Sequence, residues 1–184
     1  GLKLLSAADV EQFVLSIESI VRAYGFDGID WDLEQQNIFT VDNMLAATQR
    51  LKTRYGSDFI VTAAPAPSSV PYKVFAQRAG DLLDYIAPQY YAYADTNRLA
   101  GIKSRTAELV NTYGVPARKI GIGCKVGSEP YSAPAAFWRD AITSLRRSYP
   151  QVAGGMVWDA TAEKLAGDTF AAVTVPALLQ DATG

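Results

Sequence analysis

The sequence predicts an α/β fold in which short parallel strands alternate with helices. Five apolar segments, rich in Ile, Val, Tyr or Phe and bounded by Gly, Pro or Asp, have the composition of buried strands. Helical patterns separate them, and the segments begin 34, 26, 34 and 35 residues apart. This spacing is typical of βα units on a parallel sheet. The predicted strands are residues 25–34, 59–65, 85–93, 119–126 and 154–159.

The first predicted helix has the clearest pattern. Ser6 followed by Asp9 resembles a capping box, with Asp in place of the usual Glu, and Gly25 ends the helix. Between them, apolar residues recur at three- and four-residue steps from Val10 to Tyr24, which gives the helix one apolar face. The other candidate helices are residues 40–55, 71–79, 99–113, 134–149 and 165–179, the last of which is weakly periodic and contains Pro176.

The composition is that of one globular domain. The chain has 184 residues, 49% of them hydrophobic, and a net charge of -2, which suffices for a sizeable core and argues against disorder. No apolar run approaches the roughly 18 residues of a membrane helix. No basic run exceeds Arg146 and Arg147, so we expect neither a nucleic-acid nor a membrane partner.

The absence of histidine narrows the chemistry most. It excludes Ser-His-Asp and Cys-His nucleophile systems and His-ligated metal sites within this chain. The single Cys124 excludes an internal disulfide and a CxxC motif, and its apolar neighbours predict a buried thiol. Acid–base chemistry must therefore come from carboxylates, Tyr, Lys or the substrate itself.

Two architectures fit five βα units. An open doubly wound sheet could be complete with five strands, whereas a (β/α)8 barrel would contain them as a portion. A whole barrel usually needs about 250 residues, so length alone favours the open sheet. A phosphate or nucleotide binder on that sheet is disfavoured, because no Gly-rich phosphate loop follows any predicted strand.

Three carboxylates follow one another at alternate positions of the first predicted strand. Asp30, Asp32 and Glu34 share one face, and the apolar residues between them share the other. A solvated acidic face suits an antiparallel edge strand better than this one, because strands of βαβ units are buried on both faces. Inward carboxylates cost several kcal/mol unless they are hydrogen-bonded, protonated or bound to a ligand. The pattern therefore predicts a functional site.

A calcium-binding EF-hand loop does not explain these residues. A loop beginning at Asp30 would need Gly at its sixth position and Glu at its twelfth, where the chain has Gln35 and Val41. A Mg²⁺ site on the paired Asp residues remains open on spacing alone.

The acidic strand matches a known signature. Asp27-Gly-Ile-Asp30-Trp-Asp32-Leu-Glu34 resembles the DGxDxDxE motif of family 18 glycoside hydrolases, the chitinases and related endo-N-acetylglucosaminidases, on the fourth strand of their barrel. Later segments resemble, in order, the ends of the family's fifth, sixth and eighth strands. They are Thr62-Ala-Ala-Pro65, Ala87-Pro-Gln89-Tyr-Tyr91 and Gly155-Met-Val-Trp158.

The resemblance implies a (β/α)8 TIM barrel with the first three strands absent from this chain. Residues 1–184 would then form a single, partial glycoside hydrolase catalytic domain. A sheet that closes in the full barrel would have an open side here. We therefore expect exposed apolar edges, or association through the open barrel side.

The resemblance also implies a mechanism without histidine, metal or cofactor. In family 18 the N-acetyl oxygen of the sugar attacks its own anomeric carbon, in place of a protein nucleophile. Carried over by position, Glu34 is the general acid–base. Asp32 orients the acetamide N–H and stabilises the positive charge, and Asp30 shares a proton with Asp32, so that their titrations are coupled.

Three further residues have implied roles in binding the sugar. Tyr91 would donate its hydroxyl to the acetamide oxygen, Gln89 would lie on the same face, and Trp158 would stack under the sugar ring. The family often has Asn where this chain has Ala92, so one polar contact to the sugar would be missing. Trp138, in a helical pattern, is interpreted as packing.

The implied function is hydrolysis of chitin, the β-1,4-linked N-acetylglucosamine polymer, or of its oligosaccharides, with retention of configuration. One alternative is an endo-β-N-acetylglucosaminidase that acts on glycoproteins. Another is a catalytically inactive carbohydrate-binding or inhibitor protein on the same scaffold, although such relatives usually lose a motif carboxylate and this chain keeps them all. Secretion is expected from the resemblance alone.

Overall fold

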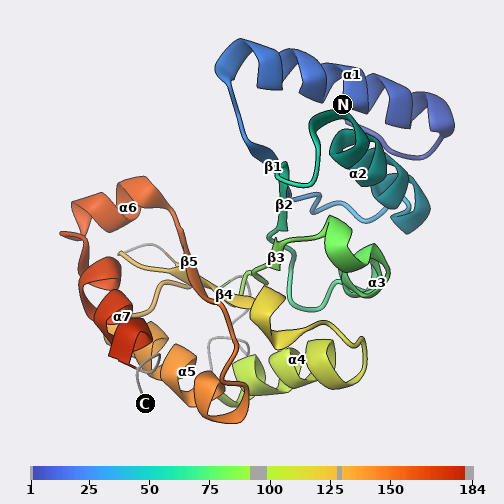
Figure 1. The fold of residues 1–184 in the computed structure, drawn as a ribbon. Helices are drawn as coiled ribbons and strands as arrows, with labels where there is room; N and C mark the ends of the chain where they lie inside the picture. Colours follow the sequence, from blue (N-terminus) through green and yellow to red (C-terminus); the bar gives the residue numbers. More distant parts are fainter. Residues whose placement is uncertain (1, 92–98, 128–129, 181–184) are drawn as a thin grey trace. The chain divides into compact units, whose positions relative to one another are not determined.

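The computed structural model describes residues 2–91, 99–127 and 130–180, which divide between two compact units, residues 1–86 and 87–184. Each unit has its own parallel sheet and its own helices (Figure 1). Strands and helices alternate along the described chain, as the spacing of the apolar segments predicts.

The first unit contains a three-stranded parallel sheet in the order β1-β2-β3, interleaved with three helices. Its elements are α1 (Ala7–Tyr24), β1 (Gly28–Trp31), α2 (Val41–Tyr55), β2 (Ile60–Ala63), α3 (Val70–Ala79), a 3-10 turn (Gly80–Leu82) and β3 (Tyr85–Ile86).

Helix α1 begins and ends as its local sequence predicts. The Ser6 hydroxyl accepts the Asp9 backbone N–H at 3.2 Å, and the Asp9 carboxylate accepts the Ser6 N–H at 2.9 Å, which completes the capping box. Gly25 ends the helix in the left-handed conformation with φ of 68°.

Trp31 anchors β1 against the helices of the first unit. Its indole is buried, stacks on Phe13 of α1 with ring centres 4.9 Å apart, and donates a hydrogen bond to the Thr48 hydroxyl of α2 at 3.1 Å. The apolar face of the acidic motif therefore packs against α1 and α2.

A buried lysine ties α2 to the sheet. The Lys52 ammonium group donates to the Asp84 carboxylate at 2.8 Å, and the Val61 backbone N–H of β2 donates to the same oxygen at 2.8 Å. The lysine side chain is almost fully buried, so this pairing satisfies a charge that would otherwise be costly.

The second unit contains a two-stranded parallel sheet, β4-β5. Helices α5 and α7 pack against each other beside this sheet (Figure 1). The elements of the second unit are α4 (Leu99–Asn111), a 3-10 turn (Ala117–Lys119), β4 (Gly121–Lys125), α5 (Ala135–Ser148), β5 (Gly154–Trp158), α6 (Ala160–Leu165) and α7 (Thr169–Gln180).

The predicted last helix, residues 165–179, is confirmed over most of its length, but its start differs. The chain forms α6, capped by Asp159, and then α7, which contains Pro176. Gly167 and Asp168, both with positive φ, separate the two helices, because left-handed residues end a right-handed helix. The Glu163 carboxylate then accepts the N–H of Ala171 in the first turn of α7 at 2.9 Å.

The core of the second unit confirms two predictions about single side chains. Trp138 is fully buried and donates its indole N–H to the Lys125 carbonyl oxygen at 2.8 Å, so it is a packing residue. Cys124 is buried in the same core, and burial raises the pKa of its thiol.

Strand β1 approaches β2 most closely at Gly28. A Cβ atom at this position would overlap the backbone carbonyl oxygen of Ile60, the residue with which Gly28 pairs. The glycine of the acidic motif therefore permits the pairing of the two strands. The same register places Asp30 opposite Thr62.

We expect Gly28→Ala to lower the free energy of unfolding by about 3 kcal/mol, because the added methyl group meets backbone that cannot rotate away. Gly25→Ala is the matched control, since its Cβ would have open space and only a left-handed backbone is strained, at about 1 kcal/mol. Urea unfolding of the parent and both variants measures this difference. An equal or smaller loss in Gly28→Ala would contradict the assignment.

Ionisation of Tyr90 is expected to destabilise the second unit at alkaline pH. Its fully buried hydroxyl lies 3.0 Å from the Thr106 hydroxyl, and burial raises its pKa from 10.0 to about 12. The unfolded chain therefore releases this proton at a lower pH than the folded one. The stabilisation is fully present below pH 10 and is lost as the pH rises to about 12.

We expect the free energy of unfolding to fall between pH 10 and 12, with on the order of 2 kcal/mol of that fall due to Tyr90. Tyr90→Phe removes the titrating group, so its stability should fall less over the same interval. Urea unfolding at pH 9, 10, 11 and 12 measures both slopes. Parallel curves for parent and variant would contradict this assignment.

Candidate active site

The acidic residues lie at and just beyond the carboxyl end of β1. The strand ends at Trp31, so Asp30 lies within it, whereas Asp32 and Glu34 lie in the segment that follows. The predicted strand over residues 25–34 is therefore too long. The predicted alternation nevertheless continues past the strand, because all three carboxylates are exposed and Trp31 is buried.

The strand ends early because its partner ends. The last backbone hydrogen bond between β1 and β2 runs from the Ala64 N–H to the Trp31 carbonyl oxygen, at 3.0 Å. The residues that donate to β1 are alternate ones, Ile60 and Ala64 among them, and β2 itself ends at Ala63. A strand of a βαβ unit is expected to be buried on both faces, whereas Asp30, Asp32 and Glu34 are all exposed.

A hydroxyl from the neighbouring strand holds the first carboxylate. Asp30 pairs with Thr62 in the β1–β2 register, and the Thr62 hydroxyl donates a hydrogen bond to the Asp30 carboxylate. The side chain of Asp30 is thus directed towards β2. Sequence reasoning used Thr62 only as part of a strand-end match, although two adjacent parallel strands would bring these positions together.

A second hydroxyl holds the backbone between the other two carboxylates. The Leu33 N–H donates to the Tyr72 hydroxyl oxygen at 2.6 Å. Tyr72 lies in α3 and is 2% exposed, so its ring is fixed by packing. Sequence reasoning missed this residue, because one tyrosine in a predicted helix carries no signal of a contact 39 positions away.

The carboxylates act electrostatically on this phenol. Burial raises the pKa of Tyr72, and the negative charges of Asp32, Asp30 and Glu34, in decreasing order, raise it further. The hydroxyl therefore keeps its proton at every pH at which the protein would work.

The segment that follows the carboxylates is tied to Leu4, which precedes α1. The Leu4 N–H donates to the Ile38 carbonyl oxygen at 2.7 Å, and the Thr40 N–H donates to the Leu4 carbonyl oxygen at 3.1 Å. Phe39, between them, is buried and packs edge-on against Tyr72 with ring centres 5.6 Å apart. The acidic segment, residues 30–38, is therefore anchored at both ends within the first unit, by the β1–β2 pairing and by Leu4.

The second unit holds the other predicted site residues, beginning with Gln89 and Tyr91. Both side chains are almost fully buried. Gln89 forms a parallel bridge with Gly123 of β4, and Tyr91 lies in a turn. Ala92, where the chain is predicted to depart from the family, lies outside the described residues.

The predicted strand over residues 85–93 is too long. Strand β3 ends at Ile86, well short of the predicted residue 93. Pro88 has no N–H for a ladder, and its carbonyl oxygen accepts both the Gly123 N–H at 2.9 Å and the Tyr90 N–H at 2.8 Å. The chain therefore turns where an extended strand was expected.

Trp158 is the last residue of β5 and is half exposed. It differs in this respect from Trp31 and Trp138, which are buried in the cores of the two units. An indole that keeps half of its surface at a strand end is free to stack on a ligand. This exposure agrees with the predicted sugar-stacking role but does not test it.

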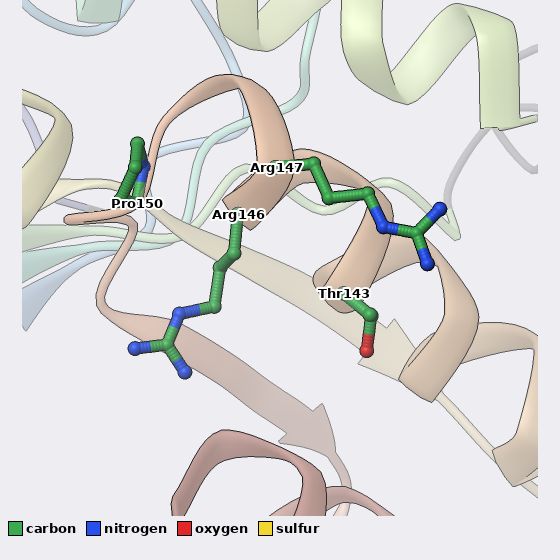
Figure 2. A pocket seen from close by; sticks show the side chains of 4 residues that line it. All are labelled: Thr143, Arg146, Arg147 and Pro150. Atoms are coloured by element: carbon green, nitrogen blue, oxygen red, sulfur yellow. The ribbon is translucent and has the colours of Figure 1, made fainter. Parts of the chain in front are cut away.

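A hollow of about 270 Å³ lies elsewhere in the second unit, lined by Thr143, Arg146, Arg147 and Pro150 (Figure 2). The Arg146 guanidinium donates to the Leu178 carbonyl oxygen at 2.9 Å and so joins α5 to α7. Figure 2 shows the Arg147 guanidinium pointing away from that of Arg146. The two charges do not converge on one ligand, so this hollow does not compete with the carboxylates as a site.

The described residues offer neither a metal centre nor a membrane-spanning helix. No group of three or more His, Cys, Asp or Glu side chains there could hold a metal ion. Within the same residues, every helix is too short or too polar to cross a membrane.

Comparison with solved structures establishes the fold. A Streptomyces coelicolor protein assigned as chitinase A superposes with a TM-score of 0.85 and 20% identity, covering 98% of this chain and 70% of the other. A fungal endo-β-N-acetylglucosaminidase of family 18 superposes with a TM-score of 0.74 and 24% identity, covering 92% and 63%. The chain has the fold of part of a (β/α)8 barrel, as the motif resemblance implies.

Sequence comparison identifies the family. A chitinase of Enterococcus faecalis is 39% identical over 97 residues, which are 47% of this chain and 28% of that protein, so this chain spans only part of its relative. The model of the glycosyl hydrolases family 18 matches residues 2–139. The chain therefore belongs to the glycosyl hydrolases of family 18.

Proposed function

We propose that this protein hydrolyses β-1,4-linked N-acetylglucosamine polymers by the retaining, substrate-assisted mechanism. The observation that carries the proposal is the arrangement of Asp30, Asp32 and Glu34, which are exposed at the carboxyl end of a parallel strand. Catalytic residues of (β/α)8 enzymes come from this end of the strands. The chitinase relatives support chitin as the substrate.

In the first step, the acetamide oxygen of the substrate attacks the anomeric carbon and the glycosidic C–O bond breaks. Glu34 donates its proton to the leaving oxygen. Asp32 accepts the acetamide N–H and balances the positive charge of the oxazolinium ion. Asp30, directed by the Thr62 hydroxyl, shares a proton with Asp32.

In the second step, water attacks the anomeric carbon and the oxazolinium C–O bond breaks. The Glu34 carboxylate takes the proton from that water, which restores the acid and leaves the product with its original configuration. Tyr91 donates to the acetamide oxygen, Gln89 contributes a polar contact, and Trp158 stacks on the sugar. The exposed indole of Trp158 supports the last assignment.

The proposal extends to the domain organisation and location of the protein. Residues 1–184 act as one partial catalytic domain, and association through the open barrel side would cover its edges. Secretion fits an enzyme whose substrate is an insoluble polymer.

An endo-β-N-acetylglucosaminidase is the second candidate, favoured by the similarity of fold to the fungal enzyme of that activity.

We expect Glu34→Gln to lower kcat by roughly 10²- to 10⁴-fold, because the amide cannot donate the proton that the leaving oxygen requires. Release of fluorophore from a fluorogenic N,N'-diacetylchitobioside measures the rate. Glu11→Gln makes the same chemical change on the surface of α1 and should leave the rate unchanged.

Equal rates in the parent and Glu34→Gln would contradict the assignment of the acid. A parent that releases no fluorophore but binds chito-oligosaccharides, measured by quenching of tryptophan fluorescence, would indicate the inactive binding protein. Cleavage of a glycoprotein N-glycan but not of the chitobioside would indicate the endo-β-N-acetylglucosaminidase.

A further inference from the structure

The hydrogen bond between Leu33 and Tyr72 continues the β1 ladder after β2 has ended. In a parallel strand, the N–H and C=O of one residue point to the same side. The carbonyl oxygens of Asp27 and Trp31 accept hydrogen bonds from β2, so the odd-numbered residues direct their backbone groups towards that strand. The N–H of Leu33 is the next donor on that side, and it meets the Tyr72 hydroxyl in place of another strand.

Packing fixes the position of this hydroxyl. The ring of Tyr72 is 2% exposed within α3, and Phe39 packs edge-on against it. Phe39 is itself held between the two hydrogen bonds that Leu4 makes on either side of it. The acceptor is therefore a rigid point attached to α3 and to the segment that follows the carboxylates.

We propose that Tyr72 is a positioning residue for catalysis, which fixes the Leu33 peptide and thereby the directions of Asp32 and Glu34. This inference rests on the proposed glycosidase function. Asp32 and Glu34 lie beyond the end of β1, on either side of the Leu33 peptide. Rotation of the peptide between them would move both side chains at once.

The chemistry of the phenol suits this role. A buried hydroxyl is uncharged, so it accepts the N–H without adding a fourth negative charge beside the three carboxylates. Burial raises the pKa of Tyr72, and the charges of the carboxylates raise it further, so both oppose its ionisation. The phenol therefore stays uncharged over the whole range of pH in which a glycosidase would operate.

The test compares Tyr72→Phe with Tyr90→Phe. Both variants lose one hydroxyl from a ring that stays buried, but the Tyr90 hydroxyl contacts Thr106 in the second unit. Both should melt at lower temperatures than the parent. Only Tyr72→Phe should lower kcat, by roughly 10-fold or more, with KM changed less than about two-fold, because misplaced catalytic groups cost rate more than binding.

Amide exchange provides a readout that does not depend on activity. In Tyr72→Phe the Leu33 amide should exchange with solvent deuterium roughly 10-fold faster or more, because its acceptor is gone. The Ala64 amide, which donates to Trp31 within the sheet, should keep the rate that it has in the parent. NMR of both amides in the 184-residue chain measures this contrast.

Unchanged kcat in Tyr72→Phe, or a fall matched by Tyr90→Phe, would overturn the proposal and leave Tyr72 a packing residue. Unchanged exchange at Leu33 would overturn it as well. A parent without glycosidase activity would end the proposed function and the catalytic part of this inference. The exchange rates would then still decide whether Tyr72 fixes the acidic segment.

Discussion

The pairing of β1 with β2 is the constraint on which the candidate site depends. Gly28 allows the two backbones to approach, and the resulting register places the Thr62 hydroxyl against the Asp30 carboxylate. The pairing stops where β2 ends, at Ala63, so the residues after Trp31 lie beyond the paired part of the sheet. Asp32 and Glu34 therefore leave the strand at its carboxyl end with their side chains in solvent.

Side chains alternate along β1, so that one face packs in the core and the other carries the acidic groups. Trp31 turns towards α1 and α2, where it stacks on Phe13 and binds Thr48, and this contact prevents a register slip that would bury the carboxylates. The side chains on either side of it face water. The short motif thus carries both a core anchor and the acidic groups, which explains why its apolar positions matter as much as its charged ones.

Local signals in the sequence predict the helix cap of this fold better than they predict the ends of its strands. The cap of α1 depends on Ser6 and Asp9 alone, and the structure confirms it. The end of β1 depends on the end of its partner strand at Ala63, more than 30 positions later, so a pattern within the motif overestimates its length. The contact of Tyr72 with Leu33 is equally non-local, and no periodicity predicts it. The carboxylates themselves were predictable because their spacing is a property of one short segment.

The configuration of the first product tests the proposed mechanism most directly, because it reports on the reaction path and not on any single residue. The protein would be mixed with an N-acetylglucosamine oligosaccharide, and the anomeric protons of the products would be followed by NMR before mutarotation. Attack by the substrate's own acetamide predicts that the β anomer appears first. Initial appearance of the α anomer would mean direct attack by water, and would contradict the roles proposed for Asp32 and Glu34.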